Sequence, residues 1–202
     1  MLVVGLTGNV TSGKSVVGAR LASLGAMLVD ADQLAREAVA PGAPGLAAIV
    51  ARWGAGVLQA DGSLDRTALR RIALADPAER RALETIVHPA VEILRRRLIA
   101  DARTRGILLL VCDIPLLFEA RLEGTVDRIV VVDAPAEVRR ARLIRDRDLD
   151  PAEADALIAT QTPSSVYRGR AQHVIENTGT LESLRDHATA LYYELDRIAR
   201  SA

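Results

Sequence analysis

The chain has 202 residues, half of them hydrophobic, and it carries 26 basic and 26 acidic residues. This length suffices for one well-packed domain with an inserted subdomain, and the balanced charge gives no bulk field that favours nucleic acid or a membrane surface. No apolar run approaches the roughly 20 residues that span a bilayer, and a glycine-rich segment begins too early for a signal peptide to precede it. We therefore expect a cytoplasmic protein that binds neither nucleic acid nor membranes, and we favour a monomer.

The first predicted element is a short apolar strand at residues 2–6, which leads into a glycine-rich loop. Residues 8–15 spell G-x-x-x-x-G-K-S, and the spacing of apolar residues predicts a helix from Lys14 to Leu24. Such a loop turns backbone N–H groups toward phosphate oxygens, Lys14 adds a mobile positive charge, and the Ser15 hydroxyl can bind Mg²⁺. Lys14 is the only lysine in the chain, which favours a phosphate site over a plain strand-to-helix turn.

A second strand is predicted at residues 27–29, and Asp30 and Asp32 follow it. In a parallel sheet these carboxylates lie at the carboxyl edge, where ligands bind in open α/β folds. Asp32 can either cap the helix that begins after it or take part in the chemistry. We favour a chemical role, more strongly for Asp32 than for Asp30.

A break at residues 41–45, rich in proline and glycine, is followed by helical patterns that continue to residue 105. A block of this length exceeds a bare crossover between strands, so it predicts a helical subdomain for substrate binding. Pro89 is expected to interrupt the last long helical stretch. We interpret His88 as a structural residue at a helix end rather than as a general base.

The apolar run at residues 107–112 predicts the third strand and contains the only cysteine, Cys112, which we interpret as a small buried hydrophobe. Asp113 follows directly. It is either a ligand that holds Mg²⁺ through water or an ordinary aspartate in a turn after a strand.

The fourth strand is predicted at residues 128–132, and an arginine-rich helix follows it. The arginines are Arg139, Arg140, Arg142, Arg145 and Arg147. A break at residues 146–151 predicts a mobile lid, and a lid arginine can neutralise charge on a transferring phosphoryl group, although most of the five can also form surface ion pairs. A short fifth strand is predicted at residues 174–175, with a last amphipathic helix at residues 181–200.

In this order, the motifs resemble those of the dephospho-coenzyme A kinases over nearly the whole chain. The segments that carry the resemblance are the phosphate loop, Asp30-Ala31-Asp32 with Arg36 and Pro41-Gly42, His88-Pro89, Pro115-Leu116-Leu117-Phe118-Glu119, and Gln161 with Val174-Ile175-Glu176-Asn177-Thr178-Gly179. The resemblance implies an α/β, three-layer P-loop kinase fold with a five-stranded parallel sheet. It implies one domain over residues 1–202, with a helical acceptor-binding insertion at 34–105 and a lid at 139–165.

The same resemblance implies an activity and roles for individual residues. The activity is ATP-dependent, Mg²⁺-assisted phosphorylation of the ribose 3′-hydroxyl of dephospho-coenzyme A, the last step of coenzyme A biosynthesis. ATP would be bound by Gly8, Thr11, Ser12, Gly13, Lys14, Ser15, Val16 and Asn177, the last of these near the adenine. Lys14, Asp32 and Arg142 would be catalytic, with Asp32 as base or orienter of the hydroxyl. Ser15 and Asp113 would hold the metal.

The chain departs from the family pattern in three segments. Asn9 and Thr11 stand where glycines are usual, which predicts a stiffer loop. Asp146-Arg147-Asp148 stands where Arg-Asp-Gly is usual, so the sequence leaves open which lid arginine meets the phosphates. Glu176 replaces an aspartate, a change that we expect to be tolerated.

Two other functions share part of this pattern. Another small-molecule P-loop kinase, such as one acting on a nucleoside monophosphate, would share the lid but would not explain the Pro-Gly break and the helical insertion. The second function is that of a nucleotide switch or ATP-binding module that transfers no phosphoryl group. If it were a GTPase, it would need an Asn-Lys-x-Asp base reader, and the only lysine already belongs to the phosphate loop.

Overall fold

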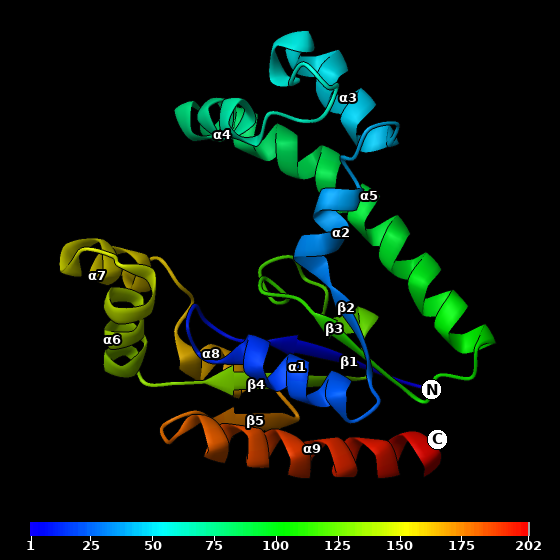
Figure 1. The fold of residues 1–202 in the computed structure, drawn as a ribbon, viewed down its shortest axis with the longest axis vertical. Coiled ribbons are helices and arrows are strands. Elements are labelled where there is room, and N and C mark those ends of the chain that lie inside the picture. The colour runs from blue at the N-terminus through cyan, green and yellow to red at the C-terminus, as the bar shows by residue number, and fades with distance from the viewer. Residues whose placement is uncertain (202) are drawn as a thin grey trace. The chain divides into compact units, whose positions relative to one another are not determined.

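The computed structural model describes residues 1–201. It contains a five-stranded parallel sheet with strand order β2-β3-β1-β4-β5 (Figure 1). The strands are β1 (Leu2–Thr7), β2 (Met27–Asp30), β3 (Leu109–Asp113), β4 (Arg128–Asp133) and β5 (His173–Glu176). In the central strand β1, Leu6 pairs with Asp113 on one side and with Val130 on the other. The predicted α/β class and five parallel strands are therefore confirmed, and the carboxyl ends of β1, β3 and β4 share one edge.

The helices occupy the segments between and after the strands. They are α1 (Lys14–Ser23), α2 (Ala31–Glu37), α3 (Pro44–Trp53), α4 (Arg66–Ala75), α5 (Pro77–Thr104), α6 (Ala136–Arg147), α7 (Pro151–Ala159), α8 (Ser164–Arg168) and α9 (Leu181–Ser201), with the 3₁₀ turns η1 (Ala55–Val57) and η2 (Glu123–Thr125). The chain forms two compact units. One comprises Met1–Val29 and the chain from Ala102 onward, and the other comprises Asp30–Asp101.

In the sheet unit, α1 and α9 cover the same face of the sheet (Figure 1). Alternation along β1 explains this packing, since successive side chains of a strand point to opposite faces. Leu6 faces α1, where a Cβ on Gly18 would lie 3.3 Å from its side chain. Gly5 faces the other way, where Leu117 would lie 2.5 Å from an added Cβ. The core on the α1–α9 face therefore fixes the strand that carries the phosphate loop.

The helical unit has a core of its own, formed by Val39, Leu46, Ile49, Val57, Leu64 and Leu69. A bridge between Leu58 and Leu64 closes a short antiparallel turn that contributes to this core. The expected interruption at Pro89 is wrong, because α5 continues through it. Pro89 is exposed, so the carbonyl that loses its helical N–H partner can be hydrated. His88 is consequently an exposed mid-helix residue and not a helix end.

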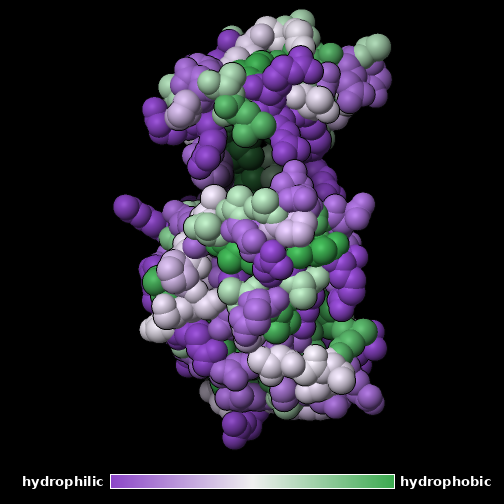
Figure 2. Space-filling view, turned by 90° about the vertical axis from the view of Figure 1, so that its left-hand side faces the viewer, coloured by the Kyte–Doolittle hydropathy of each residue, from purple (hydrophilic) through white to green (hydrophobic). Residues whose placement is uncertain are grey.

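Cys112 is fully buried, as predicted. On the face shown in Figure 2, hydrophilic residues predominate and hydrophobic ones are scattered among them. Within residues 1–201 no helix combines the length and the apolar character that a membrane span requires.

We predict that Leu195→Ala lowers the free energy of unfolding by about 2–5 kcal/mol, because truncating a fully buried leucine removes its apolar contacts and leaves a cavity. Leu181→Ala on the same helix is the control, since Leu181 is 51% exposed and its truncation should change stability by less than about 1 kcal/mol. Denaturant-induced unfolding of both variants measures the difference. Equal losses would contradict the packing of α9 described above.

Candidate active site: the phosphate loop and its supports

The loop between β1 and α1 approaches its neighbours too closely for side chains at two positions. Gly8 has φ +155°, and a Cβ there would lie 2.3 Å from the carbonyl oxygen of Val132. Gly13 has φ +101°, and a Cβ there would lie 2.3 Å from Nδ2 of Asn177. The two glycines of the motif are therefore required by contact with β4 and with the loop after β5, as well as by backbone conformation.

The start of α1 is suited to binding an anion. Gly13 is its N-cap and offers no side-chain acceptor to the first amides of the helix. Ser12 is 1% exposed, and its hydroxyl has no hydrogen-bond partner in the part of the chain that the structure describes. Helix N-termini with unsatisfied N–H groups bind phosphate through those groups and through the helix dipole. The loop residues predicted to bind ATP phosphates thus have the local geometry that this chemistry needs.

Lys14 and Asp113 form an ion pair, although sequence reasoning gave them separate roles. The pair follows from the register of the sheet, because Asp113 ends β3 beside Leu6 of β1 and Lys14 begins the next helix. Both side chains are mostly buried, with 14% and 13% exposed. Ser15, the other predicted metal ligand, is exposed. Beside the loop, Lys14 therefore provides a positive charge, and Ser15 and Asp113 provide side-chain oxygen atoms that can bind a metal ion.

The two residues that replace glycines in the loop connect it to residues 139–164, which lie within the predicted lid. The side-chain amide of Asn9 donates to the carbonyl of Thr162 at 3.2 Å and to the hydroxyl of Ser164 at 3.3 Å. Thr11, at φ +54°, donates its hydroxyl to the carbonyl of Arg139 at 3.0 Å. Glycine could form neither contact. These bonds attach the loop to α6 and to the segment before α8.

Arg142 and Asn177 close a network around the outside of the loop. The Arg142 guanidinium donates to the carbonyl of Thr11 at 3.1 Å and to Oδ1 of Asn177 at 3.1 Å. Nδ2 of Asn177 donates to the carbonyl of Ser12 at 2.7 Å. The structure thus brings both predicted residues to the phosphate loop, and in this state each holds the loop backbone.

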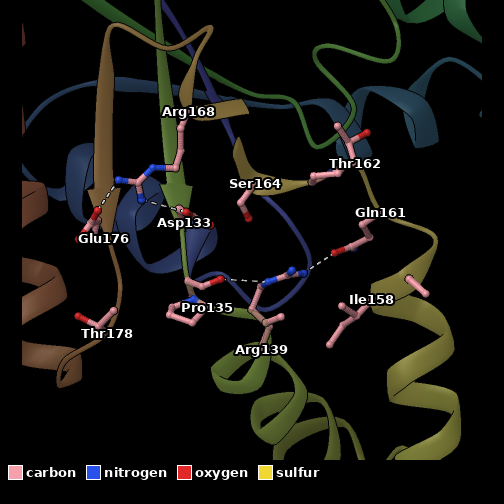
Figure 3. Close-up of a pocket in the computed structure, with 14 residues that line it drawn as sticks. Asp133, Pro135, Arg139, Ile158, Gln161, Thr162, Ser164, Arg168, Glu176 and Thr178 are labelled. Carbon is pink, nitrogen blue, oxygen red and sulfur yellow. Dashed lines mark hydrogen bonds and ion pairs between the residues drawn. The ribbon is translucent and has the colours of Figure 1, made fainter. Parts of the chain in front are cut away.

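Sequence reasoning missed a particular role for Arg139, the most buried of the arginines on α6. Its guanidinium donates to the carbonyl of Ala134 at 3.1 Å and to Oε1 of Gln161 at 2.6 Å. Burial lowers the pKa of this group, and the nearby Asp133 carboxylate partly offsets the effect. Figure 3 shows Arg139 extending from α6 toward Gln161. No local pattern distinguishes it from its arginine neighbours, because its partners lie in other elements.

Arg139 lines a pocket of about 580 Å³ at the carboxyl ends of β4 and β5 (Figure 3). On the opposite side of this pocket, Arg168 donates to Asp133 at 3.1 Å and bridges to Glu176 at 2.5 Å. The remaining lining residues are Ala134, Pro135, Ala136, Ile158, Ala159, Gln161, Thr162, Pro163, Ser164 and Thr178. Glu176, the third departure from the family pattern, thus forms an ion pair in the wall of this pocket.

Glu119 joins the loop after β3 to the end of the lid region, a role that only the Pro-Leu-Leu-Phe-Glu motif hinted at. Its Oε1 accepts from the hydroxyls of Tyr167 at 2.6 Å and Thr162 at 2.7 Å. Burial raises the pKa of the Glu119 carboxyl, but these two hydrogen bonds, a backbone hydrogen bond and the charge of Arg170 together outweigh burial, and the net pKa is lowered. Burial and the Glu119 carboxylate raise the pKa of Tyr167 to about 12. Glu119 is therefore an ionised acceptor that holds this segment.

The cap of α2 is Asp30 and not Asp32. Oδ1 of Asp30 accepts from the backbone N–H groups of Asp32 at 2.8 Å and Gln33 at 3.3 Å. The Asp32 carboxylate is exposed and makes no hydrogen bond or ion pair with any residue from 1 to 201. The alternative in which Asp32 caps the helix is therefore wrong, because the Asp30 side chain already accepts hydrogen bonds from the first amides of α2.

We predict that Arg142→Met weakens ATP binding about tenfold, because it removes charge-assisted hydrogen bonds that hold the loop. Faster hydrogen exchange at residues 8–15 should accompany the loss. Arg145→Met is the matched control on the same helix, since Arg145 is 72% exposed and pairs only with Asp146. Calorimetric ATP titration and hydrogen exchange measure both effects, and equal behaviour of the two variants would argue against the network.

Comparison with known proteins agrees with this geometry. A family model described as dephospho-CoA kinase matches residues 2–183. A dephospho-CoA kinase of Anaeromyxobacter dehalogenans is 48% identical over 96% of this chain and 92% of its own length. The crystal structure of TT1252 from Thermus thermophilus superposes with a TM-score of 0.77 at 37% identity, covering 96% of this chain and 97% of that one. The dephospho-CoA kinase from Campylobacter jejuni has the same fold, with a TM-score of 0.76 at 22% identity over 96% of this chain and 97% of its own. The chain belongs to the dephospho-CoA kinase family.

Proposed function

We propose that this chain transfers the γ-phosphoryl group of ATP to the ribose 3′-hydroxyl of dephospho-coenzyme A, giving coenzyme A and ADP. The observation that carries the proposal is the phosphate loop with its Lys14–Asp113 pair at the carboxyl edge of the sheet, in a chain of the dephospho-CoA kinase family. That family performs the final step of coenzyme A biosynthesis. We place the activity in the cytoplasm and in a monomer, and we assign it no nucleic acid or membrane partner.

On the ATP side, the backbone amides from Thr11 to Val16 bind the β- and γ-phosphates, and Asn177 lies near the adenine. Lys14 exchanges its contact with Asp113 for the outer phosphates, where its positive charge stabilises the transition state. Arg142 now donates to neutral acceptors, a carbonyl and an amide oxygen. Hydrogen bonds from a guanidinium to phosphate are stronger than those, so bound ATP competes favourably for it.

Mg²⁺ fits the residues beside the loop. Ser15 and Asp113 supply the oxygen ligands that the ion prefers, and in nucleotide sites it usually takes one or two protein ligands together with phosphates and waters. The contact of the Asp113 carboxylate with Lys14 supports this assignment, because Lys14 belongs to the loop. When bound, the ion would neutralise part of the negative charge on the phosphates.

On the acceptor side, Asp32 orients the ribose hydroxyl and accepts its proton late in the transfer. Its carboxylate has no competing contact with residues 1–201, and it follows the end of β2 directly. We assign acceptor binding to residues 34–105 and lid closure to residues 139–165. The helical segment Asp30–Asp101 supports the first assignment because it is compact by itself, and the helix ends at Arg147 and Pro151 support the second.

The acceptor assay tests the proposed function. Purified protein with ATP and Mg²⁺ should release ADP when dephospho-coenzyme A is present, and the product should carry a 3′-phosphate. Nucleoside monophosphates and no acceptor at all serve as parallel reactions, and Lys14→Ala serves as the inactive control. Turnover with a nucleoside monophosphate would assign a different small-molecule kinase, and acceptor-independent ADP release would assign a nucleotide switch.

We predict that Asp32→Asn lowers turnover roughly a hundredfold or more, the usual scale for losing a general base, while ATP affinity and melting temperature stay near those of the wild type. The side chain keeps its size but loses its charge and its capacity to accept a proton. Asp30→Ala is the companion variant, and it should lower stability by about 0.5–2 kcal/mol while turnover changes little, because Asp30 caps α2 and alanine cannot. A small effect on turnover would remove Asp32 from the chemistry, and a loss of ATP binding would move it to the metal site.

A further inference from the structure

The helical unit contains a pocket of about 390 Å³ whose lining residues come from α2, the segment after it, the turn that leads into α4, and the first residues of α4. Two walls belong to the core of this unit, since Val39 and Leu64 are both buried. Arg36 and Arg66 line the pocket from different elements. A pocket built on a packed core with two cations is a site for an anionic ligand.

Neither arginine is neutralised by the protein. Arg36 and Arg66 form no hydrogen bond and no ion pair within residues 1–201, whereas Arg52 in the same unit is paired with Glu79. The only acid that lines the pocket is Asp65. Its Oδ1 accepts from the backbone N–H groups of Thr67 and Ala68, both at 2.9 Å, and so caps α4. Two guanidinium groups remain available to a ligand that enters the pocket.

The spacing on α2 relates these arginines to the proposed reaction. Asp32 and Arg36 are four residues apart on one helix, which places them on the same face with a rise of about 6 Å between them. In dephospho-coenzyme A the 5′-diphosphate is attached to the same ribose that carries the 3′-hydroxyl. A ribose held at Asp32 therefore places its diphosphate about one helical turn away, within reach of the long Arg36 side chain.

We infer that Arg36 and Arg66 bind the diphosphate of the acceptor, dephospho-coenzyme A, in this pocket. The inference rests on the proposed function and assigns part of its acceptor site. Planar guanidinium groups bind diphosphates through paired hydrogen bonds, which a single ammonium group cannot reproduce. Arg36 and Arg66 thereby hold the nucleotide in register with Asp32, and they act in acceptor binding and not in the transfer step.

The test is binding of dephospho-coenzyme A by calorimetry, with the ATP site saturated by the β,γ-imido analogue of ATP so that no transfer occurs. Arg36→Met and Arg66→Met should each weaken binding about tenfold or more, as expected for charge-assisted hydrogen bonds. In turnover assays they should raise the KM for dephospho-coenzyme A while the KM for ATP stays unchanged. Arg71→Met is the matched control, because Arg71 is an exposed, unpaired arginine of α4 outside the pocket.

Two results separate this inference from the function on which it rests. If the wild type binds and phosphorylates dephospho-coenzyme A, but the Arg36 and Arg66 variants bind it no more weakly than the Arg71 variant, only the diphosphate site is overturned. If the wild type neither binds nor phosphorylates it, the proposed function falls as well. Adenosine, tested as a competitive inhibitor against dephospho-coenzyme A, shows which part of the acceptor the arginines contact, because it lacks the diphosphate. Its inhibition constant should be the same in the variants as in the wild type. If adenosine binding weakened as much as dephospho-coenzyme A binding, the assignment to the diphosphate would be overturned.

Discussion

The close approach of the phosphate loop to the strands around it is the constraint on which the rest of the site depends. Because the loop amides must point inward to meet phosphate, the outside of the loop packs against protein. At Gly8 the neighbour is the carbonyl of Val132, and at Gly13 it is the amide of Asn177. Both contacts require that β4 and β5 lie on the same side of β1, which is the strand order observed. The order of the sheet and the geometry of the loop therefore determine one another.

The same packing connects the loop to the lid region through polar side chains. Asn9 donates to Thr162, Thr11 donates to the backbone of Arg139, and Arg142 donates to the carbonyl of Thr11. Each partner lies more than 40 residues away in sequence, so these bonds form only when the sheet is assembled. A movement of α6 away from the loop must break or exchange both of its bonds to Thr11 together. The two side chains that replace glycines in the loop thus exchange local backbone freedom for attachment to α6 and to the segment around Thr162.

The sequence was informative where the determinants were local. Periodicity predicted all five strands, and the motif predicted the position of the phosphate loop, since each depends on a few adjacent residues. The prediction failed at Pro89, where solvent exposure makes the lost hydrogen bond tolerable. The sequence also left open whether Asp32 caps α2, and the structure shows that Asp30, two residues earlier, takes the cap. Arg139 could not be distinguished from its neighbours, because burial and the contact with Gln161 depend on tertiary packing.

The arginines of α6 show why residue type alone does not assign a lid function. Arg140 and Arg145 form exposed ion pairs with Asp155 and Asp146, which contribute little because water screens them. Arg139 and Arg142 instead donate to neutral carbonyl and amide oxygens. A guanidinium that is satisfied by neutral acceptors keeps its full charge for an incoming anion, whereas one paired with a carboxylate has already been neutralised. The positive charge that α6 keeps free of carboxylates therefore lies on its inward-facing arginines, and the surface pairs do not reduce it.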